Sequence, residues 1–199
     1  MSYINITSLF KTPYDFVPIN LNQLFIQNKH LIPSIKDPYY LNKVLRNLRM
    51  FTYGGYGENR KDIWNGTYLD ETKGYFHLGV DINVYKNTSV FSPMDTKVID
   101  VFTDTDTKIG WGGRVILQNK KNKPFIIMGH FDPTSINVEK GQHLNTGELI
   151  GKVGTWPTNG NTFEHLHLQL RMTSDFDTMD GYGTESDLLN NPCPFTTKI

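Results

Sequence analysis

The sequence predicts a mainly β protein, an antiparallel barrel or sandwich with an N-terminal helical preface. Two observations predict this class. After Gly74, short runs rich in β-branched and aromatic residues are separated by Gly, Asn, Asp and Pro, and one amphipathic stretch precedes them. The chain has 199 residues, which suits one domain with a substantial core.

The N-terminal part divides at Asp37. Residues 1 to about 36 are rich in Asn, Ile and Pro and show no regular pattern, so we expect an extended arm. Asp37 is a suitable N-cap, and Pro38 suits the first turn of a helix. The helix is expected to end before Gly54. Its apolar positions recur at helical spacing and are expected to pack against the body: Leu41, Val44, Leu45 and Leu48.

The body is assigned to residues 53–199, and the arm and helix to residues 1–52. A proline-punctuated tail, residues 187–195, is expected to close the domain. Six runs in the body are predicted to be short strands or hairpins: 76–84, 96–103, 113–119, 124–131, 143–154 and 165–172.

Composition limits the partners. Lys plus Arg equals Asp plus Glu at 20 each, so the net charge gives no support for a nucleic-acid or anionic-membrane partner. No stretch has the length of a membrane span, and the first residues do not resemble an export signal, so the default expectation is a cytoplasmic protein. The lone cysteine, Cys193, excludes an internal disulfide and is expected to be a bystander.

The candidate chemistry lies in the histidines of the β-like runs. Side chains at i, i+2 and i+4 of a strand share a face, so His77 and Asp81 are expected to point the same way, as are His165 and His167. A catalytic zinc site needs three protein ligands and leaves the fourth position to water. His130 adds another imidazole after an apolar run. This combination predicts a metal site if the two strands are neighbours.

Several other residues are predicted to be ordinary. His30 and His143 are expected to be solvated surface groups. The glycines at 54–57 are expected to form a turn, because the Gly-Lys-Ser/Thr ending of a phosphate loop is missing. Trp111, in a glycine-rich hairpin, is expected either to line a cleft or to pack over the sheet.

The order and spacing of five segments resemble those of the lysostaphin-type, or β-lytic, zinc endopeptidases. The resemblance covers about residues 74 to 170. A stretch ahead of it, Tyr56–Arg60, together with Trp156, Pro157 and Asn159–Gly160, resembles a branch of the family whose domains accompany unrelated enzymes. The five segments are His77–Asp81, Met128–Phe131, Gly141–Gln142, Gly147–Gly151 and His165–His167.

This resemblance implies a fold of the duplicated-hybrid-motif type and one Zn²⁺ per chain. It implies that His77, Asp81 and His167 hold the metal and that His130 and His165 are catalytic without binding it. Which of these two is the general base stays open. The implied substrate is a peptide bond in peptidoglycan cross-bridges or stem peptides. Oligomeric state is not predicted.

Two departures from the family pattern concern the cleft. Met128 stands where an aromatic is usual, and Glu164 stands where a small residue or proline is usual, so Glu164 is expected to add negative charge beside the cleft. The missing export signal keeps open a cytoplasmic zinc amidase or peptidase acting on another substrate. A non-catalytic binding or regulatory module is a further alternative, against which the intact ligand set argues.

The arm has two interpretations. It either lies across the cleft and offers the metal an oxygen, or, with the helix, covers a face of the sheet; we favour the second. It follows that deleting residues 1–36 should leave a folded enzyme with less than about a tenfold change in activity. Deletion through Leu48 should yield unfolded or insoluble protein.

Overall fold

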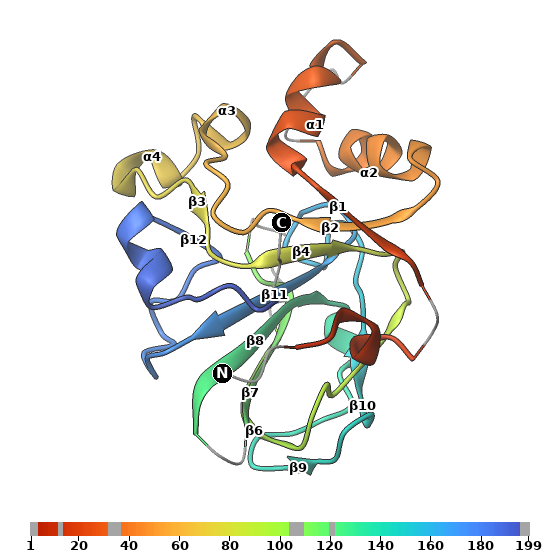
Figure 1. The fold of residues 1–199 in the computed structure, drawn as a ribbon, viewed down its shortest axis with the longest axis vertical. Helices are drawn as coiled ribbons and strands as arrows, with labels where there is room; N and C mark the ends of the chain where they lie inside the picture. Colours follow the sequence, from red (N-terminus) through yellow and green to blue (C-terminus); the bar gives the residue numbers. More distant parts are fainter. Residues whose placement is uncertain (1–3, 12–13, 32–36, 104–109, 120–121, 196–199) are drawn as a thin grey trace.

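The computed structural model describes residues 4–11, 14–31, 37–103, 110–119 and 122–195. Its centre is an eight-stranded sheet with the order β1-β2-β4-β11-β8-β7-β6-β9 (Figure 1). The mainly β class is confirmed, and the described strands form an open sheet rather than a closed barrel. The eight strands are β1 Phe16–Ile19, β2 Phe51–Gly54, β4 Val80–Asn83, β6 Thr96–Thr103, β7 Gly113–Asn119, β8 Asn122–Phe131, β9 His143–Leu144 and β11 Leu166–Arg171.

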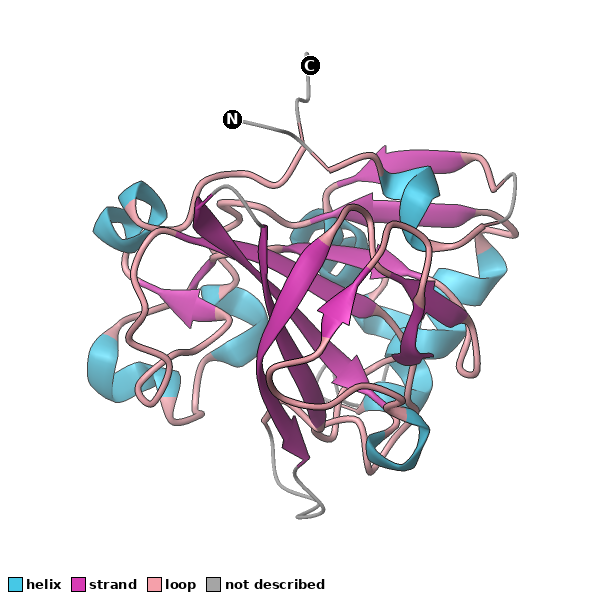
Figure 2. Ribbon diagram, turned by 90° about the horizontal axis from the view of Figure 1, so that it is seen from below, coloured by secondary structure: helices cyan, strands magenta, loops and turns pink. Residues whose placement is uncertain are grey.

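Two small antiparallel sheets accompany the large one, β10-β5 and β12-β3. Their strands are β3 Phe76–His77, β5 Ser89–Phe91, β10 Leu149–Lys152 and β12 Tyr182–Gly183. The predicted strand 76–84 is therefore two strands, because the chain leaves β3 at Leu78 and enters β4 at Val80. The described ends of the chain meet, since the N–H of Ile4 donates to the carbonyl of Pro194 at 3.2 Å (Figure 2).

The main core covers one face of the large sheet. Successive side chains of a strand point to opposite faces, so alternate residues of β4, β8 and β11 enter this core and those between them face the other way. The buried residues contributed by these three strands are Val80, Ile82, Ile126, Met128, Phe131, Leu166, Leu168 and Leu170. The opposite face carries a smaller apolar cluster around Ile116, Phe125 and Ile127 and, beside it, the polar side chains of β4 and β11.

The predicted amphipathic helix is α2, Pro38–Asn47. Asp37 is its N-cap, as expected, and its side chain accepts a hydrogen bond from the N–H of Tyr39. The apolar stripe does not cover a sheet face, contrary to expectation. It packs instead in a second cluster whose other fully buried members are Leu21, Phe25, Ile63 and Phe163.

The prediction of an irregular arm was wrong. It contains β1, the helix α1 (Leu21–Gln27) and two 3-10 helices, Ile6–Leu9 and Lys29–Leu31. β1 holds a proline and lies at the sheet edge, where a missing N–H is tolerated, and it pairs in parallel with β2. β2 runs across the boundary placed at residue 52, and the division into domains stays a prediction.

Deleting residues 1–36 is now expected to give insoluble or unfolded protein, rather than the folded enzyme predicted from the sequence. Leu9, Phe10, Leu21 and Phe25 are at most 2% exposed. Each such side chain contributes about 1.5–3 kcal/mol of burial free energy, so their combined loss approaches the ~5–15 kcal/mol stability of a typical domain. Circular dichroism and gel filtration of the truncated chain measure the outcome. A cooperative melt near that of the full chain would contradict it.

The remaining helices are short. α3 (Lys61–Trp64) and α4 (Leu69–Thr72) lie between β2 and β3, and two 3-10 helices span Pro133–Ser135 and Glu185–Leu189. Within the described ranges, no helix combines the length and apolar character needed to cross a membrane.

Candidate metal centre and active site

Strand β11 places His167 between the two strands that carry the other candidate residues. In the register of the sheet His167 lies opposite Asp81 of β4 and opposite Gly129 of β8. Its neighbours Leu166 and Leu168 point into the core on the other face. The strands bearing Asp81 and His167 are therefore neighbours, which is the condition for a shared site.

A β-bulge turns His130 toward the same place. Gly113 of β7 pairs with Phe131, but Val115 pairs with Met128, so β8 holds one extra residue. His130 itself has φ 67°, in the left-handed region that residues other than glycine rarely adopt. Regular alternation from Met128 would point residue 130 into the core. With the bulge, Phe131 takes that position, fully buried, and His130 lines the cleft.

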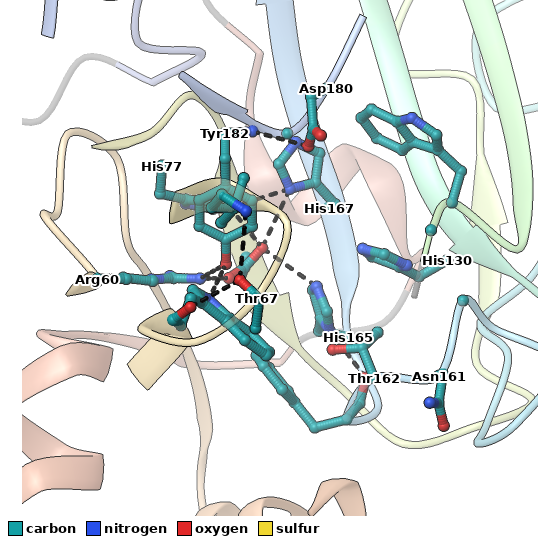
Figure 3. Close-up of a pocket in the computed structure, with 18 of the residues that line it drawn as sticks. Arg60, Thr67, His77, His130, Asn161, Thr162, His165, His167, Asp180 and Tyr182 are labelled. Carbon is teal, nitrogen blue, oxygen red and sulfur yellow. Dashed lines mark hydrogen bonds and ion pairs between the residues drawn. The ribbon is translucent and has the colours of Figure 1, made fainter. Parts of the chain in front are cut away.

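Four acceptor atoms converge at the centre of the site (Figure 3). Oδ1 of Asp81 lies 3.2 Å from Nε2 of His77, 3.2 Å from Nε2 of His165 and 3.2 Å from Nδ1 of His167. His77 Nε2 and His167 Nδ1 are 3.1 Å apart. None of the four side chains is more than 3% exposed. His130 stands beside them, with its ring centroid 4.4 Å from that of His165.

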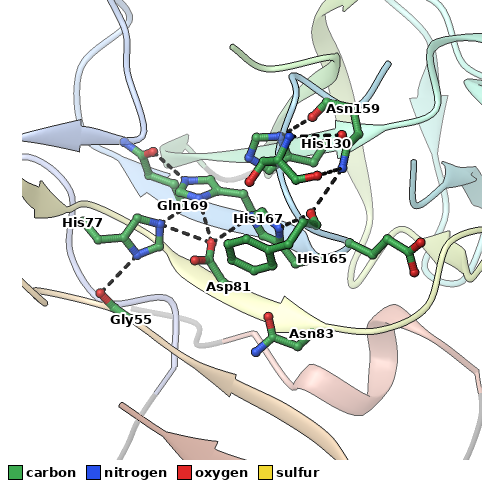
Figure 4. A network of polar contacts seen from close by, with 12 residues as sticks. Gly55, His77, Asp81, Asn83, His130, Asn159, His165, His167 and Gln169 are labelled. Atoms are coloured by element: carbon green, nitrogen blue, oxygen red, sulfur yellow. Dashed lines mark hydrogen bonds and ion pairs between the residues drawn. The ribbon is translucent and has the colours of Figure 1, made fainter. Parts of the chain in front are cut away.

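Backbone carbonyls fix the protonation of three of these rings (Figure 4). A carbonyl oxygen only accepts, so each Nδ1 bound to one carries the ring proton and leaves Nε2 with a lone pair. Such a lone pair can bind a metal or take a proton. The three contacts are His77 Nδ1 to Gly55 O at 3.0 Å, His130 Nδ1 to Asn159 O at 2.8 Å and His165 Nδ1 to Phe163 O at 2.9 Å.

His167 is oriented by a chain of side chains that ends on a backbone carbonyl. Nδ2 of Asn191 donates to the carbonyl of Asp187 at 2.7 Å, which leaves Oδ1 of Asn191 to accept from Nε2 of Gln169 at 2.7 Å. Oε1 of Gln169 then faces Nε2 of His167 at 3.0 Å. Nε2 of His167 must therefore donate, and Nδ1 carries the lone pair that faces Asp81.

This donor set fits a bound metal cation. The converging atoms of His77, Asp81 and His167 carry no proton to share, and lone pairs 3.1–3.2 Å apart repel one another unless a cation lies among them. Zn²⁺ with bonds of about 2.0–2.1 Å in tetrahedral geometry spaces its ligand atoms about 3.3–3.4 Å apart. A second group, His130, His165 and His167, brings its nitrogens within 4.8 Å but lacks a carboxylate.

The charge states favour metal binding. Burial, together with the nearby Arg60, lowers the pKa of His77 to about 3, so this imidazole is neutral at neutral pH. Burial and the neighbouring His165 hold the pKa of His130 well below its usual value. Burial acts to raise the pKa of Asp81, yet this pKa stays well below its usual value. With the imidazoles neutral, the cation that keeps it low is Arg60, whose Nη1 donates to Oδ2 at 2.8 Å. The site therefore presents the neutral imidazoles of His77 and His130 beside an ionised carboxylate.

A cavity of ≈ 330 Å³ opens beside these residues. Trp111 lines it and also packs over the sheet, since its ring stacks at 22° on His130 and meets His167 edge-on. Both alternatives for Trp111 hold. The described lining residues run from Arg60 to Tyr182, so the described part of the arm does not enter the cleft.

Four residues that support the site were not predicted as parts of it: Arg60, Gln169, Tyr182 and Asn191. Gln169 had a signal, because it continues the alternation that places His165 and His167 on one face. Tyr182 had none, since its contacts join segments more than 100 residues apart in the chain, as in the 3.0 Å bond to its hydroxyl from Arg60 Nη1. Arg60 shares no strand or helix spacing with Asp81, its partner 21 residues later.

The expectation that Glu164 adds charge to the cleft was wrong. Glu164 adjoins His165 and points away from the cavity, whose lining does not include it. It forms an ion pair with Arg46 of α2 and accepts hydrogen bonds from the N–H of Lys86 at 3.1 Å and the hydroxyl of Thr155 at 3.0 Å. The carboxylate is therefore a buried link between α2 and the loop before β11.

The other candidates are as expected where the structure tests them. His30 and His143 are exposed. Cys193 is a free, half-buried thiol whose pKa is raised by burial, and it is not among the described residues that line the cleft. Gly55 and Gly57 have positive φ values of 99° and 70°, as a turn requires.

The sequence matches the model of the family described as Peptidase family M23 over residues 75–179, more than half of the chain. The chain belongs to this family. The resemblance to lysostaphin-type peptidases is thereby confirmed, and the description of the family as a peptidase family indicates a hydrolase. None of the curated proteins matches the chain.

Several solved peptidase structures are similar to the chain. The catalytic domain of the antimicrobial peptidase lysostaphin from Staphylococcus simulans is 22% identical, with 74% of this chain and 96% of that one covered and a TM-score of 0.49. A zinc-containing peptidase from Vibrio cholerae is 27% identical, with 48% and 27% covered and a TM-score of 0.40. The aligned part spans only 40% of a longer lysostaphin chain, at 22% identity and a TM-score of 0.43 over 53% of this chain.

Proposed function

We propose that the protein is a zinc-dependent endopeptidase that hydrolyses peptide bonds of peptidoglycan cross-bridges or stem peptides. In this proposal His77, Asp81 and His167 hold one Zn²⁺, and His130 and His165 act on the reacting bond. The observation that carries the proposal is the set of lone pairs around Asp81 Oδ1, each held by a hydrogen bond on the far ring nitrogen. Membership of a peptidase family supplies the reaction class.

Zn²⁺, when bound, would lower the pKa of its water toward neutrality and polarise the scissile carbonyl. His130 and His165 each present an Nε2 lone pair, because their Nδ1 protons are held by the carbonyls of Asn159 and Phe163. Either can therefore accept a proton from the attacking water as a general base. Once protonated, the same Nε2–H can donate to a developing oxyanion or to the leaving amine. The base stays unassigned between the two.

The cleft favours an endopeptidase. A carboxypeptidase needs a cation to bind the substrate's terminal carboxylate. Among the described residues that line the cavity, Arg60 is the only Lys or Arg, and it is 2% exposed and paired with Asp81. Besides Asp81, the acidic residue of the described lining is Asp180; the other walls carry aromatic, aliphatic and uncharged polar side chains and the histidines of the site.

The test is hydrolysis by the zinc-loaded protein of purified muropeptides, cross-linked peptidoglycan and short glycyl peptides, followed by mass spectrometry. New amine termini from cell-wall substrates, absent with His165→Ala, are the expected result. Cleavage of small peptides without any action on muropeptides would favour the alternative of a peptidase with a different substrate. No cleavage by a zinc-loaded, folded protein would favour a non-catalytic module.

A further inference from the structure

Arg60 lies beside the candidate metal centre, away from solvent. Nη1 of Arg60 donates to Oδ2 of Asp81 at 2.8 Å and to the hydroxyl of Tyr182 at 3.0 Å. Nε1 of Trp64 donates to the same hydroxyl at 2.7 Å. Because the guanidinium engages Oδ2, the oxygen of Asp81 that faces the ring nitrogens is Oδ1. Figure 3 shows Arg60 approaching the cluster from the side opposite His130.

The N-terminal segment holds Arg60 in turn. Nε of Arg60 lies 3.2 Å from Oε2 of Glu58. The Glu58 carboxylate accepts the N–H groups of Leu21 at 2.9 Å and Asn22 at 3.3 Å, the first residues of α1. A continuous chain of polar contacts therefore runs from α1 through Glu58 and Arg60 to Asp81. Its first three members lie outside the matched family region, residues 75–179.

The guanidinium of Arg60 is closely packed, and its burial costs folding free energy. Gly55 has φ 99°, and a Cβ there would lie 2.1 Å from Nη2 of Arg60 and 2.9 Å from Nδ1 of His77. Nη2 is buried without a hydrogen-bond partner among the described residues. An unpaired buried donor and a buried charge both cost folding free energy, so stability alone is a poor reason for this arginine.

We propose that Arg60 is a positioning residue for the metal centre, and that Glu58 and α1 set its place. By occupying Oδ2, Arg60 restricts Asp81 to binding through Oδ1 and fixes the carboxylate plane. This inference rests on the proposed function, since it needs Asp81 as a metal ligand. In this proposal the N-terminal segment helps to position a metal ligand. It acts through Glu58 and does not lie across the cleft.

The test measures the Zn²⁺ dissociation constant by competition with a chromophoric chelator. Arg60→Met is expected to raise it about 10- to 100-fold, the range found when a residue that orients a ligand is lost. Arg60→Lys should give a smaller rise, because one ammonium cannot span Asp81, Glu58 and Tyr182 as the guanidinium does. Arg114→Met is the matched control, since Arg114 is also buried and paired with a carboxylate, Asp100, but contacts no candidate ligand.

The melting temperatures of the metal-free proteins separate positioning from a purely structural role. A structural role would lower these temperatures for Arg60→Met and Arg114→Met alike and leave both dissociation constants near wild type. Wild-type zinc affinity in a folded Arg60→Met would overturn the proposal.

If Arg60→Met does not fold, the Zn²⁺ dissociation constant of Glu58→Gln is measured in its place. A Zn²⁺ dissociation constant that is about threefold or more above wild type in this variant supports the proposal. An unchanged dissociation constant overturns it. If the wild-type protein binds no zinc, the proposed function itself is contradicted.

Discussion

Replacing His77, Asp81 or His167 by alanine is expected to remove most of the zinc from a protein that otherwise carries about one ion per chain. The three side chains are buried and supply the atoms 3.1–3.2 Å apart, so a metal ion loses a full ligand with each substitution. Metal analysis by mass spectrometry after desalting measures the loss. Full zinc occupancy in all three variants would contradict the proposed ligand set.

The same measurement separates the two groups of residues that can gather around a metal. If the ion belongs to His130, His165 and His167, then His130→Ala loses zinc and His77→Ala keeps it. His143→Ala is the matched control, because this exposed histidine lies on β9, away from the centre. It should leave the zinc content unchanged.

His130→Ala and His165→Ala are expected to keep the metal and lose about two orders of magnitude or more in turnover. This is the scale of loss when a general base or an oxyanion donor is deleted. Steady-state kinetics on the best peptidoglycan substrate, with zinc content and melting temperature determined on the same samples, measure it. Turnover within about tenfold of wild type in either variant would show that its imidazole is dispensable.

Local patterns predicted much of the scaffold. The Asp37 cap and the apolar spacing gave α2, and alternation in 165–172 placed His165 and His167 opposite the core-facing leucines of β11. These features depend on residues a few positions apart, which is the range over which periodicity and capping act.

What local patterns missed depends on distant partners. β1 is four residues long and holds a proline, and it pairs along its whole length with β2, more than 30 residues later. The bulge at His130 comes from the register between β7 and β8 and not from any unusual residue. Glu164 likewise depends on Arg46 of α2 for its charge partner. Two-residue alternation therefore identified the candidate histidines, but it did not identify the distant residues that orient them.

The wide separation of the site residues along the chain affects how the protein folds. His77 and His167 are 90 residues apart, and Asp81 and His167 are 86 apart. Contacts of this range require long loops to close, so they form slowly and only with the β4–β11 pairing. An ion bound at this site would not act as a folding nucleus, because His167 joins His77 and Asp81 only once the sheet has formed. By mass action such an ion would stabilise the native state and mainly slow unfolding.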